Sequence, residues 1–186
     1  MRALFLNPVV AAFAAFFAMS PAQATESGNP EVAELLAELR DPDQERWQRI
    51  ERQISRIWSH SGSASSDLLL QRGRDAMRRG DTTAAIDHFS ALIDHAPDFA
   101  EGYHARATAW FMAGNLGLAL DDLRETLVRN PDHFSALAGL GRVFEDLELY
   151  DRAREALRAS AAIHPHRTDV LEALERIERH LTGTAL

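Results

Sequence analysis

The chain has 186 residues, enough for one domain of ordinary size, and its 46% hydrophobic and 26% charged residues are typical of a soluble globular protein. The sequence contains no cysteine, which excludes disulfides, thiolate chemistry and cysteine-ligated metals. Its net charge of −8 argues against nucleic acid and against anionic membrane surfaces as partners.

The first 24 residues have the pattern of a secretory signal peptide. Arg2 gives a positive start, an apolar run extends from Val9 to Met19, and Ala22-Gln23-Ala24 provides the small residues that signal peptidase accepts. We therefore expect cleavage after Ala24 and a periplasmic or secreted protein that does not insert into the membrane. The alternative is an N-terminal membrane anchor beginning near Ala3, although the apolar run is shorter than the about 20 residues that a spanning helix needs.

Residues 29–60 are predicted to form an N-terminal helical element of two helices. The first begins at Asn29-Pro30-Glu31 and the second at Asp41-Pro42, and each carries apolar residues at helical spacing: Val32, Leu35, Leu36 and Leu39, then Trp47, Ile50, Ile54, Ile57 and Trp58. A serine-rich flexible link follows at 61–66. The element either caps one end of the repeats described next or forms a separate contact element.

The centre of the chain contains an internal repeat of 34 residues. Pro97, Pro131 and Pro165 set the period, and residues of matching type recur at constant distances before each proline. These are a small residue (Gly73, Ala107, Gly141), an alanine (Ala85, Ala119, Ala153) and a bulky apolar residue (Phe89, Leu123, Leu157). Small residues let two antiparallel helices approach closely, so each copy is predicted to be a helical hairpin.

Turn and cap residues agree with three hairpins. Gly80 and Gly114 lie where a first helix must end in a left-handed residue, whereas the third copy has Glu148 there and is expected to be strained or differently shaped. The prolines end the second helices. Asp98 and Asp132 are predicted to cap the helices that follow.

This spacing of small residues, aromatic residues and prolines from Ser66 to Pro165 resembles the tetratricopeptide repeat family. The resemblance implies an all-α fold, a right-handed α-solenoid with hairpins at 66–99, 100–133 and 134–167. A C-terminal capping helix is expected at 168–182, with one apolar face made of Val170, Leu171, Leu174, Ile177 and Leu181.

No residue pattern indicates catalysis. There is no glycine-rich phosphate loop, nucleophile elbow or HExxH motif, so an enzyme and a bound cofactor are not expected. His164 and His166 form the nearest approach to a metal-ligand pair, but nothing at helical spacing completes a site, and no metal is predicted. The pair Asp121-Asp122 is interpreted as part of a solvated helix face.

The family resemblance implies a concave groove lined by the first helix of each repeat. The residues at the lining positions that we expect to contact a partner are Leu70, Arg74, His104, Thr108, Phe111 and Arg142. Arg74 and Arg142 suit a carboxylate ligand, unless they pair with Glu101 and Glu145 instead. Chaperone-binding members hold a C-terminal carboxylate with lysine and asparagine; the matching positions here are Leu70, Arg74, Ala105, Ser135 and Gly139, so that clamp is absent.

The sequence therefore predicts a periplasmic protein-interaction scaffold that binds a segment of an envelope or secreted protein. Two alternatives are an assembly or maturation factor that presents secreted apoproteins to modification machinery, and a structural protein that self-associates through Trp47 and Trp58.

Overall fold

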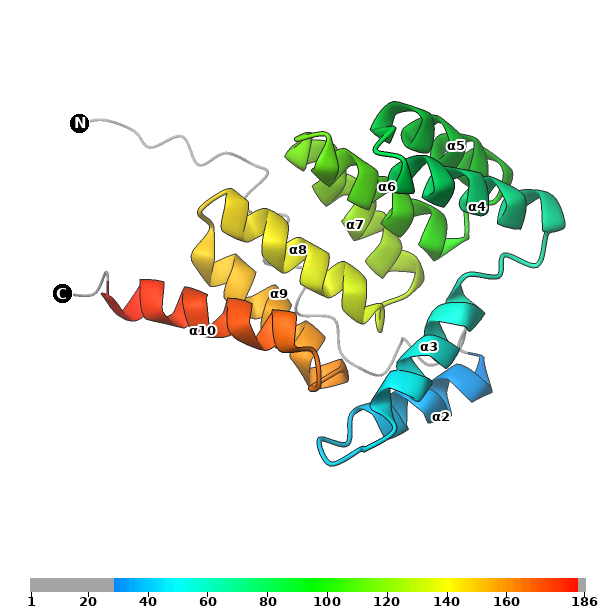
Figure 1. The fold of residues 1–186 in the computed structure, drawn as a ribbon. Helices are drawn as coiled ribbons and strands as arrows, with labels where there is room; N and C mark the ends of the chain where they lie inside the picture. The colour runs from blue at the N-terminus through cyan, green and yellow to red at the C-terminus, as the bar shows by residue number, and fades with distance from the viewer. Residues whose placement is uncertain (1–28, 184–186) are drawn as a thin grey trace, which may run out of the picture. The chain divides into compact units, whose positions relative to one another are not determined.

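A computed structural model describes residues 29–183 of the chain, and every regular element in this range is an α-helix (Figure 1). The helices are α2 (Pro30–Leu39), α3 (Trp47–Trp58), α4 (Ala64–Arg78), α5 (Thr82–His95), α6 (Ala100–Met112), α7 (Leu116–Arg129), α8 (Phe134–Asp146), α9 (Tyr150–Ile163) and α10 (Thr168–Gly183). The predicted signal peptide and the alternative anchor lie outside the described residues. Within 29–183, no helix has both the length and the apolar character that crossing a membrane requires.

Helices α4 to α9 form three hairpins in succession, α4 with α5, α6 with α7 and α8 with α9 (Figure 1). Each first helix also packs against the second helix of the preceding hairpin, and α10 packs against α9. The all-α repeat fold predicted from the 34-residue period is therefore confirmed.

The contacts inside each hairpin depend on the small residues of the repeat. A β-carbon added at Gly73 would lie 2.6 Å from Cδ1 of Phe89, and one added at Gly141 would lie 2.6 Å from Cδ2 of Leu157. The recurring alanine of the second helices is fully buried in all three copies, at Ala85, Ala119 and Ala153. In the first and third hairpins the bulky residue of the second helix thus fills the space that a side chain would take on the first helix.

The turns inside the hairpins share one backbone conformation. The left-handed residue has φ of 77° at Gly80, 78° at Gly114 and 58° at Glu148. The third turn therefore keeps the shape of the other two, and the strain expected from a non-glycine residue falls on Glu148.

Several predicted boundaries and caps were wrong. Helix α3 begins at Trp47, since residues 41–46 form turns in which Asp41 and Gln44 accept hydrogen bonds from nearby backbone N–H groups. Helix α4 begins at Ala64, so the link is shorter than the predicted 61–66. The backbone N–H of Ser61, in the link, donates a hydrogen bond to Asp67 of α4. Asp98 and Asp132 do not cap their helices, because the N-cap positions are occupied by Phe99 and His133.

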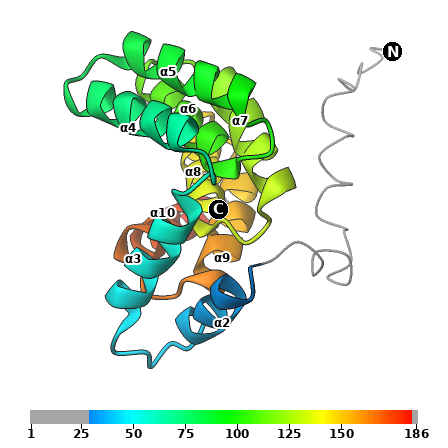
Figure 2. The same ribbon diagram turned by 90° about the vertical axis from the view of Figure 1, so that its right-hand side faces the viewer.

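The N-terminal element does not cover the free end of the first repeat. Helix α3 lies instead beside the later repeats (Figure 2). The Trp58 ring stacks on His133 with centroids 4.6 Å apart, and the Trp47 ring stacks on His166 at 5.5 Å. Ile54 of α3 and Leu39 of α2 are fully buried. We refer to α3 as the strap, because it bridges the start of α8 and the start of α10.

Glu148→Gly is expected to raise the free energy of unfolding by about 1 kcal/mol. Glycine removes the left-handed backbone strain of about 1–2 kcal/mol and loses part of that gain to the greater freedom of the unfolded chain. Urea denaturation measures the change. Glu148→Ala keeps the strain and serves as the control, so an equal gain in both variants would show that the effect does not come from the backbone.

Candidate functional site

The first helices of the three hairpins share a face that carries two adjoining cavities. One, of about 390 Å³, lies between α4 and α6, and the other, of about 300 Å³, lies between α6, α8 and the start of α10. His104 and Thr108 line both cavities, so the two form one continuous groove across α6. We call this surface the groove.

Five of the six predicted contact residues line the groove: Arg74, His104, Thr108, Phe111 and Arg142. Leu70 does not, and this part of the prediction was wrong. Its side chain is only 2% exposed and packs in the core with Phe89, Leu92 and Ala105. Helix α4 is rotated so that this position faces α5 and α6 rather than the groove. That the other five bind a partner remains a prediction.

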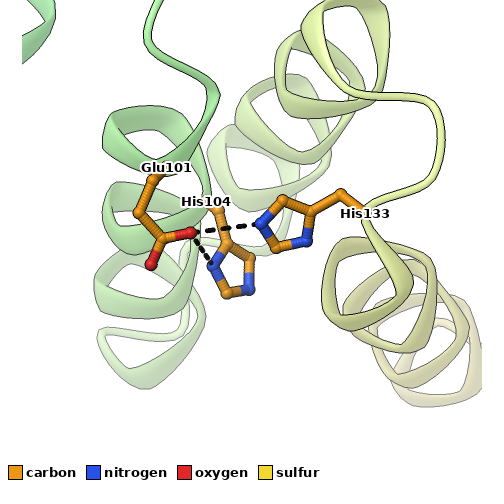
Figure 3. A group of neighbouring side chains, drawn as sticks. All are labelled: Glu101, His104 and His133. Atoms are coloured by element: carbon orange, nitrogen blue, oxygen red, sulfur yellow. Dashed lines mark hydrogen bonds and ion pairs between the residues drawn. The ribbon is translucent and has the colours of Figure 1, made fainter. Parts of the chain in front are cut away.

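A buried carboxylate at the start of α6 connects three of the first helices. Glu101, with a side chain 11% exposed, forms an ion pair with Arg74 of α4 through one oxygen. Its other oxygen lies 3.1 Å from Nε2 of His133, at the start of α8, and 3.3 Å from Nδ1 of His104, one turn along α6 (Figure 3). The pairing of Glu101 with Arg74 was one of the alternatives that the sequence left open, whereas the contact with His133 was not predicted.

The hydrogen bonds of His133 determine where its proton lies. Nδ1 accepts a hydrogen bond from the backbone N–H of Ala136 at 3.2 Å, as the N-cap of α8, so the proton of the neutral ring is on Nε2 and is donated to Glu101. Burial, together with the charge of His104, lowers the pKa of His133 and keeps it neutral. Burial by itself would raise the pKa of Glu101, but the charge of His104 and the hydrogen bond from His133 hold it well below its usual range.

These three residues also resemble a metal centre, because their ligand atoms lie within 4.8 Å of one another. The hydrogen bonds argue against that function. A metal bound at Nε2 of His133 requires the proton on Nδ1, and Nδ1 already accepts from a backbone N–H. Arg74 also occupies the other carboxylate oxygen of Glu101. Glu101, Arg74 and His133 are thus already joined in a hydrogen-bonded network of their own, whereas Nδ1 of His104 lies beside Glu101 without a hydrogen bond to a described residue.

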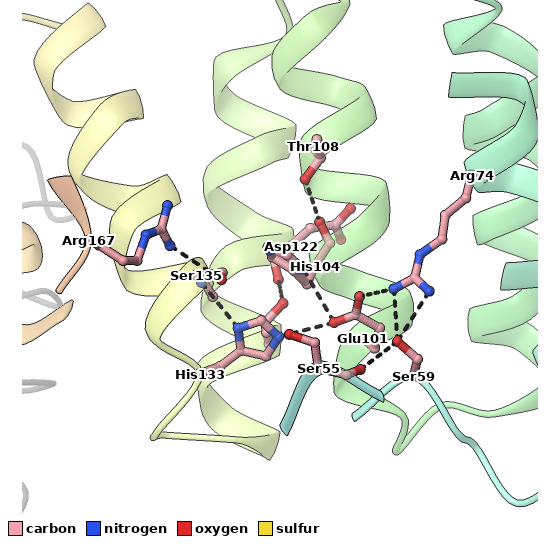
Figure 4. A network of polar contacts seen from close by, with 12 residues as sticks. Ser55, Ser59, Arg74, Glu101, His104, Thr108, Asp122, His133, Ser135 and Arg167 are labelled. Carbon is pink, nitrogen blue, oxygen red and sulfur yellow. Dashed lines mark hydrogen bonds and ion pairs between the residues drawn. The ribbon is translucent and has the colours of Figure 1, made fainter. Parts of the chain in front are cut away.

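The network continues from the groove into the strap (Figure 4). Both terminal nitrogens of Arg74 donate to the Ser59 hydroxyl at 3.1 Å, and Ser59 is the C-cap residue of α3. The Ser59 hydroxyl in turn donates to the backbone oxygen of Ser55 at 2.7 Å. Because Trp58 stacks on His133, the strap is held at its C-terminal end by two members of the Glu101 network.

Asp122 was wrongly assigned to a solvated face. Its carboxylate is buried and accepts two hydrogen bonds from Arg106, at 2.7 and 2.8 Å, which joins α7 to α6. Arg106 also donates to Ser90 of α5 at 3.1 Å. A bidentate pair at this depth fixes the helices behind the groove. Asp121, its neighbour, is exposed.

The sequence model of the tetratricopeptide repeat family matches residues 70–127 and 113–167, which together cover more than half of the chain. The chain belongs to the tetratricopeptide repeat family. A TPR repeat-containing protein of Rhizobium etli is 28% identical over 161 residues, which are 86% of this chain and 79% of that protein.

Solved tetratricopeptide repeat domains have the same fold. The Sgt2 TPR domain of Aspergillus fumigatus aligns with a TM-score of 0.63 and 25% identity, over 66% of this chain and 83% of that domain. The first TPR domain of Spaghetti (RPAP3), solved with an HSP90 peptide, aligns with a TM-score of 0.63 and 20% identity, over 64% of this chain and 95% of that domain. Both alignments place the three hairpins within the tetratricopeptide repeat fold.

His164, just before α10, is a second buried histidine under the strap. Its side chain is 0% exposed, its ring meets Trp47 edge-on at 5.6 Å, and neither ring nitrogen makes a hydrogen bond with a described residue. Burial, reinforced by the charges of Arg167 and His166, lowers its pKa to about 4, despite Glu51 at 3.6 Å. The neutral ring therefore packs as an aromatic side chain.

Glu101→Gln is expected to lower the free energy of unfolding by about 3 kcal/mol. That is the lower end of the range for breaking a buried ion pair, since Arg74 keeps 41% of its side chain exposed. Glu178→Gln is the matched control, because the pair of Arg158 and Glu178 lies in solvent and contributes at most about 1 kcal/mol. Urea denaturation compares the two. Equal losses would refute the structural importance of the Glu101 network.

The stability of the fold is expected to fall as the pH is lowered from 6.5 to about 4. His164 has a folded pKa of about 4 and an ordinary value of 6.5, so below pH 6.5 the unfolded chain binds a proton that the folded chain lacks. The loss from this residue is on the order of 3 kcal/mol and is complete near pH 4. His133 shifts stability in the same direction, and Glu101 adds to the loss below pH 4.5.

His164→Phe separates the contribution of this ring from the others. The variant is expected to lose less stability than the wild type between pH 7 and pH 4.5 in urea denaturation, because phenylalanine fills the same site and cannot bind a proton. His95→Phe, at an exposed position, should follow the wild type. A wild-type stability that does not change over this interval would contradict the assignment of His164 as a neutral buried ring.

Proposed function

We propose that this protein is a periplasmic interaction scaffold whose groove binds a segment of an envelope or secreted protein. The observation that carries the proposal is the pair of adjoining cavities over α4, α6 and α8, which share His104 and Thr108 and together reach across three first helices. The Spaghetti (RPAP3) domain of the same fold is solved with a peptide of HSP90. The export signal in residues 1–24 supports the periplasmic location.

The state of the titratable groups at the groove favours binding over catalysis. Arg74 and His133 are both bonded to Glu101, and His133 is fully buried. A general base or nucleophile needs a free proton-accepting atom facing the substrate, and these groups use theirs in structural contacts. These groups therefore favour the interpretation of the groove as a binding surface rather than an active site.

The partner segment differs from the C-terminal peptides that carboxylate-clamp domains hold. Of the five clamp positions, Leu70 and Ala105 are buried, Gly139 has no side chain, and the Arg74 guanidinium is bound to Glu101 and Ser59. Self-association through Trp47 and Trp58 also loses its basis, because both rings stack on histidines of the same chain. A maturation factor is distinguished from a scaffold by its preference for unfolded over folded clients.

Thr108→Trp is expected to reduce partner capture at least ten-fold. Thr108 is exposed and lines both cavities, so a tryptophan there blocks the groove without disturbing the core. Val128→Trp is the matched control, because Val128 is 61% exposed on α7 and lines neither cavity of the groove. The measurement is crosslinking in intact cells that produce the chain, followed by quantitative mass spectrometry of the attached proteins. Equal recovery with both variants would place binding outside the groove.

The proposed periplasmic location of the protein is tested by a separate experiment. The chain recovered from the periplasmic fraction should begin at Thr25, as N-terminal sequencing or intact mass would show. A chain that retains residues 1–24 and sediments with membranes would support the anchored alternative.

A further inference from the structure

The charges along the groove are almost all neutralised by neighbouring side chains. Arg74 is paired with Glu101 and Arg78 with Asp75. Arg167, at the edge of the cavity between α6 and α8, binds Asp169 at 2.6 Å and also donates to the Ser135 hydroxyl at 3.4 Å. Among the described residues, Arg142 is the one groove arginine that makes neither a hydrogen bond nor an ion pair within the chain.

Two carboxylates that line a cavity together with Arg142 have other partners. Glu145, one turn later on α8, accepts two hydrogen bonds from Arg176, at 2.6 and 2.9 Å, and Asp169 is held by Arg167. This corrects the sequence-based alternative in which Arg142 pairs with Glu145. Arg142 is exposed, and it therefore keeps its hydrogen-bond donors for a ligand.

An apolar surface lies directly beside this cation. The guanidinium carbon of Arg142 is 5.6 Å from the centroid of the Phe111 ring, across the cavity between α6 and α8. The same cavity is lined by Leu123, Val143 and Ala138. A guanidinium next to an aromatic ring is kept in place by that contact, so it is partly preorganised to receive an anion.

We infer that the segment bound between α6 and α8 carries one acidic side chain next to an apolar one. The carboxylate pairs with the Arg142 guanidinium, and the apolar side chain fills the cavity over Phe111 and Leu123. This inference rests on the proposed function of the groove. It defines a subsite outside the five clamp positions, because Arg142 is none of them.

Two observations limit the acidic character of the segment to a single side chain. A C-terminal aspartate or glutamate presents two carboxylates, and among residues 29–183 Arg142 is the one groove arginine that has no ion pair. A run of acidic residues would also approach Asp146 and Glu172, which line the adjoining cavity between α8 and α10 together with Arg142. Like charges placed side by side oppose binding, so we expect neutral residues to follow the acidic one.

The test uses fluorescein-labelled nonapeptide pools with acetylated and amidated ends, whose central residue is glutamate, glutamine or lysine between leucines and whose other positions are alanine, serine or glycine. Fluorescence anisotropy with the mature wild-type chain should show the glutamate pool binding at least ten-fold more tightly than the glutamine pool, and the lysine pool more weakly still. Arg142→Glu should reverse this order. Arg79→Glu, an equal change of charge at an exposed position outside the groove lining, should leave the order unchanged.

The outcomes separate this inference from the proposed function. If the glutamate and glutamine pools bind equally to the wild type and Thr108→Trp abolishes both, the groove binds peptides and the inference fails. Tighter binding of a pool with a free C-terminal carboxylate than of the glutamate pool would overturn it in favour of a terminal ligand. A chain that captures partners through the groove in cells but binds none of the pools would overturn it as well.

Discussion

The arrangement of the first helices depends on the negative charge of Glu101. A carboxylate so far from water is stable only when it is paired and hydrogen-bonded, and its partners come from α4 and from the start of α8. Removing any of them would leave a charge or a polar atom unsatisfied. The contact therefore specifies the relative positions of three successive repeats. Apolar packing between small and large residues is less directional and specifies these positions less well.

The contacts of Glu101 also determine which groove residues are available to bind a partner. Arg74 has the charge and the position to hold a ligand carboxylate, but Glu101 and Ser59 already occupy its donors. His133, which caps α8, is covered by Trp58 of the strap. The site that stays available lies further along α6 and α8, where Phe111 and Arg142 face one cavity.

The fold could be predicted from the sequence because its signals are periodic and local. Small residues, turn residues and prolines repeat every 34 positions, and each acts on its own hairpin. The groove residues, apart from Leu70, were those that the resemblance to the tetratricopeptide repeat family implies. The Glu101 network could not be predicted, since Arg74, Glu101 and His133 lie about one repeat apart and meet only in three dimensions. The burial of Asp122 could not be predicted either, because a charged residue is expected in solvent unless its partner, here Arg106, is known.

The strap explains why the two ends of each first helix serve different purposes. At the N-terminal ends of α6 and α8, Glu101 and His133 bind the strap through Arg74 and Trp58, so their polar groups stabilise the fold. At the C-terminal halves of the same helices, Phe111 and Arg142 line a cavity and have no such role. A segment that enters the groove thus meets an edge formed by the Glu101 network on the side of the strap and an edge formed by Phe111 and Arg142 on the other. Substitutions at the second edge can therefore change what the groove binds while leaving the network that holds the repeats intact.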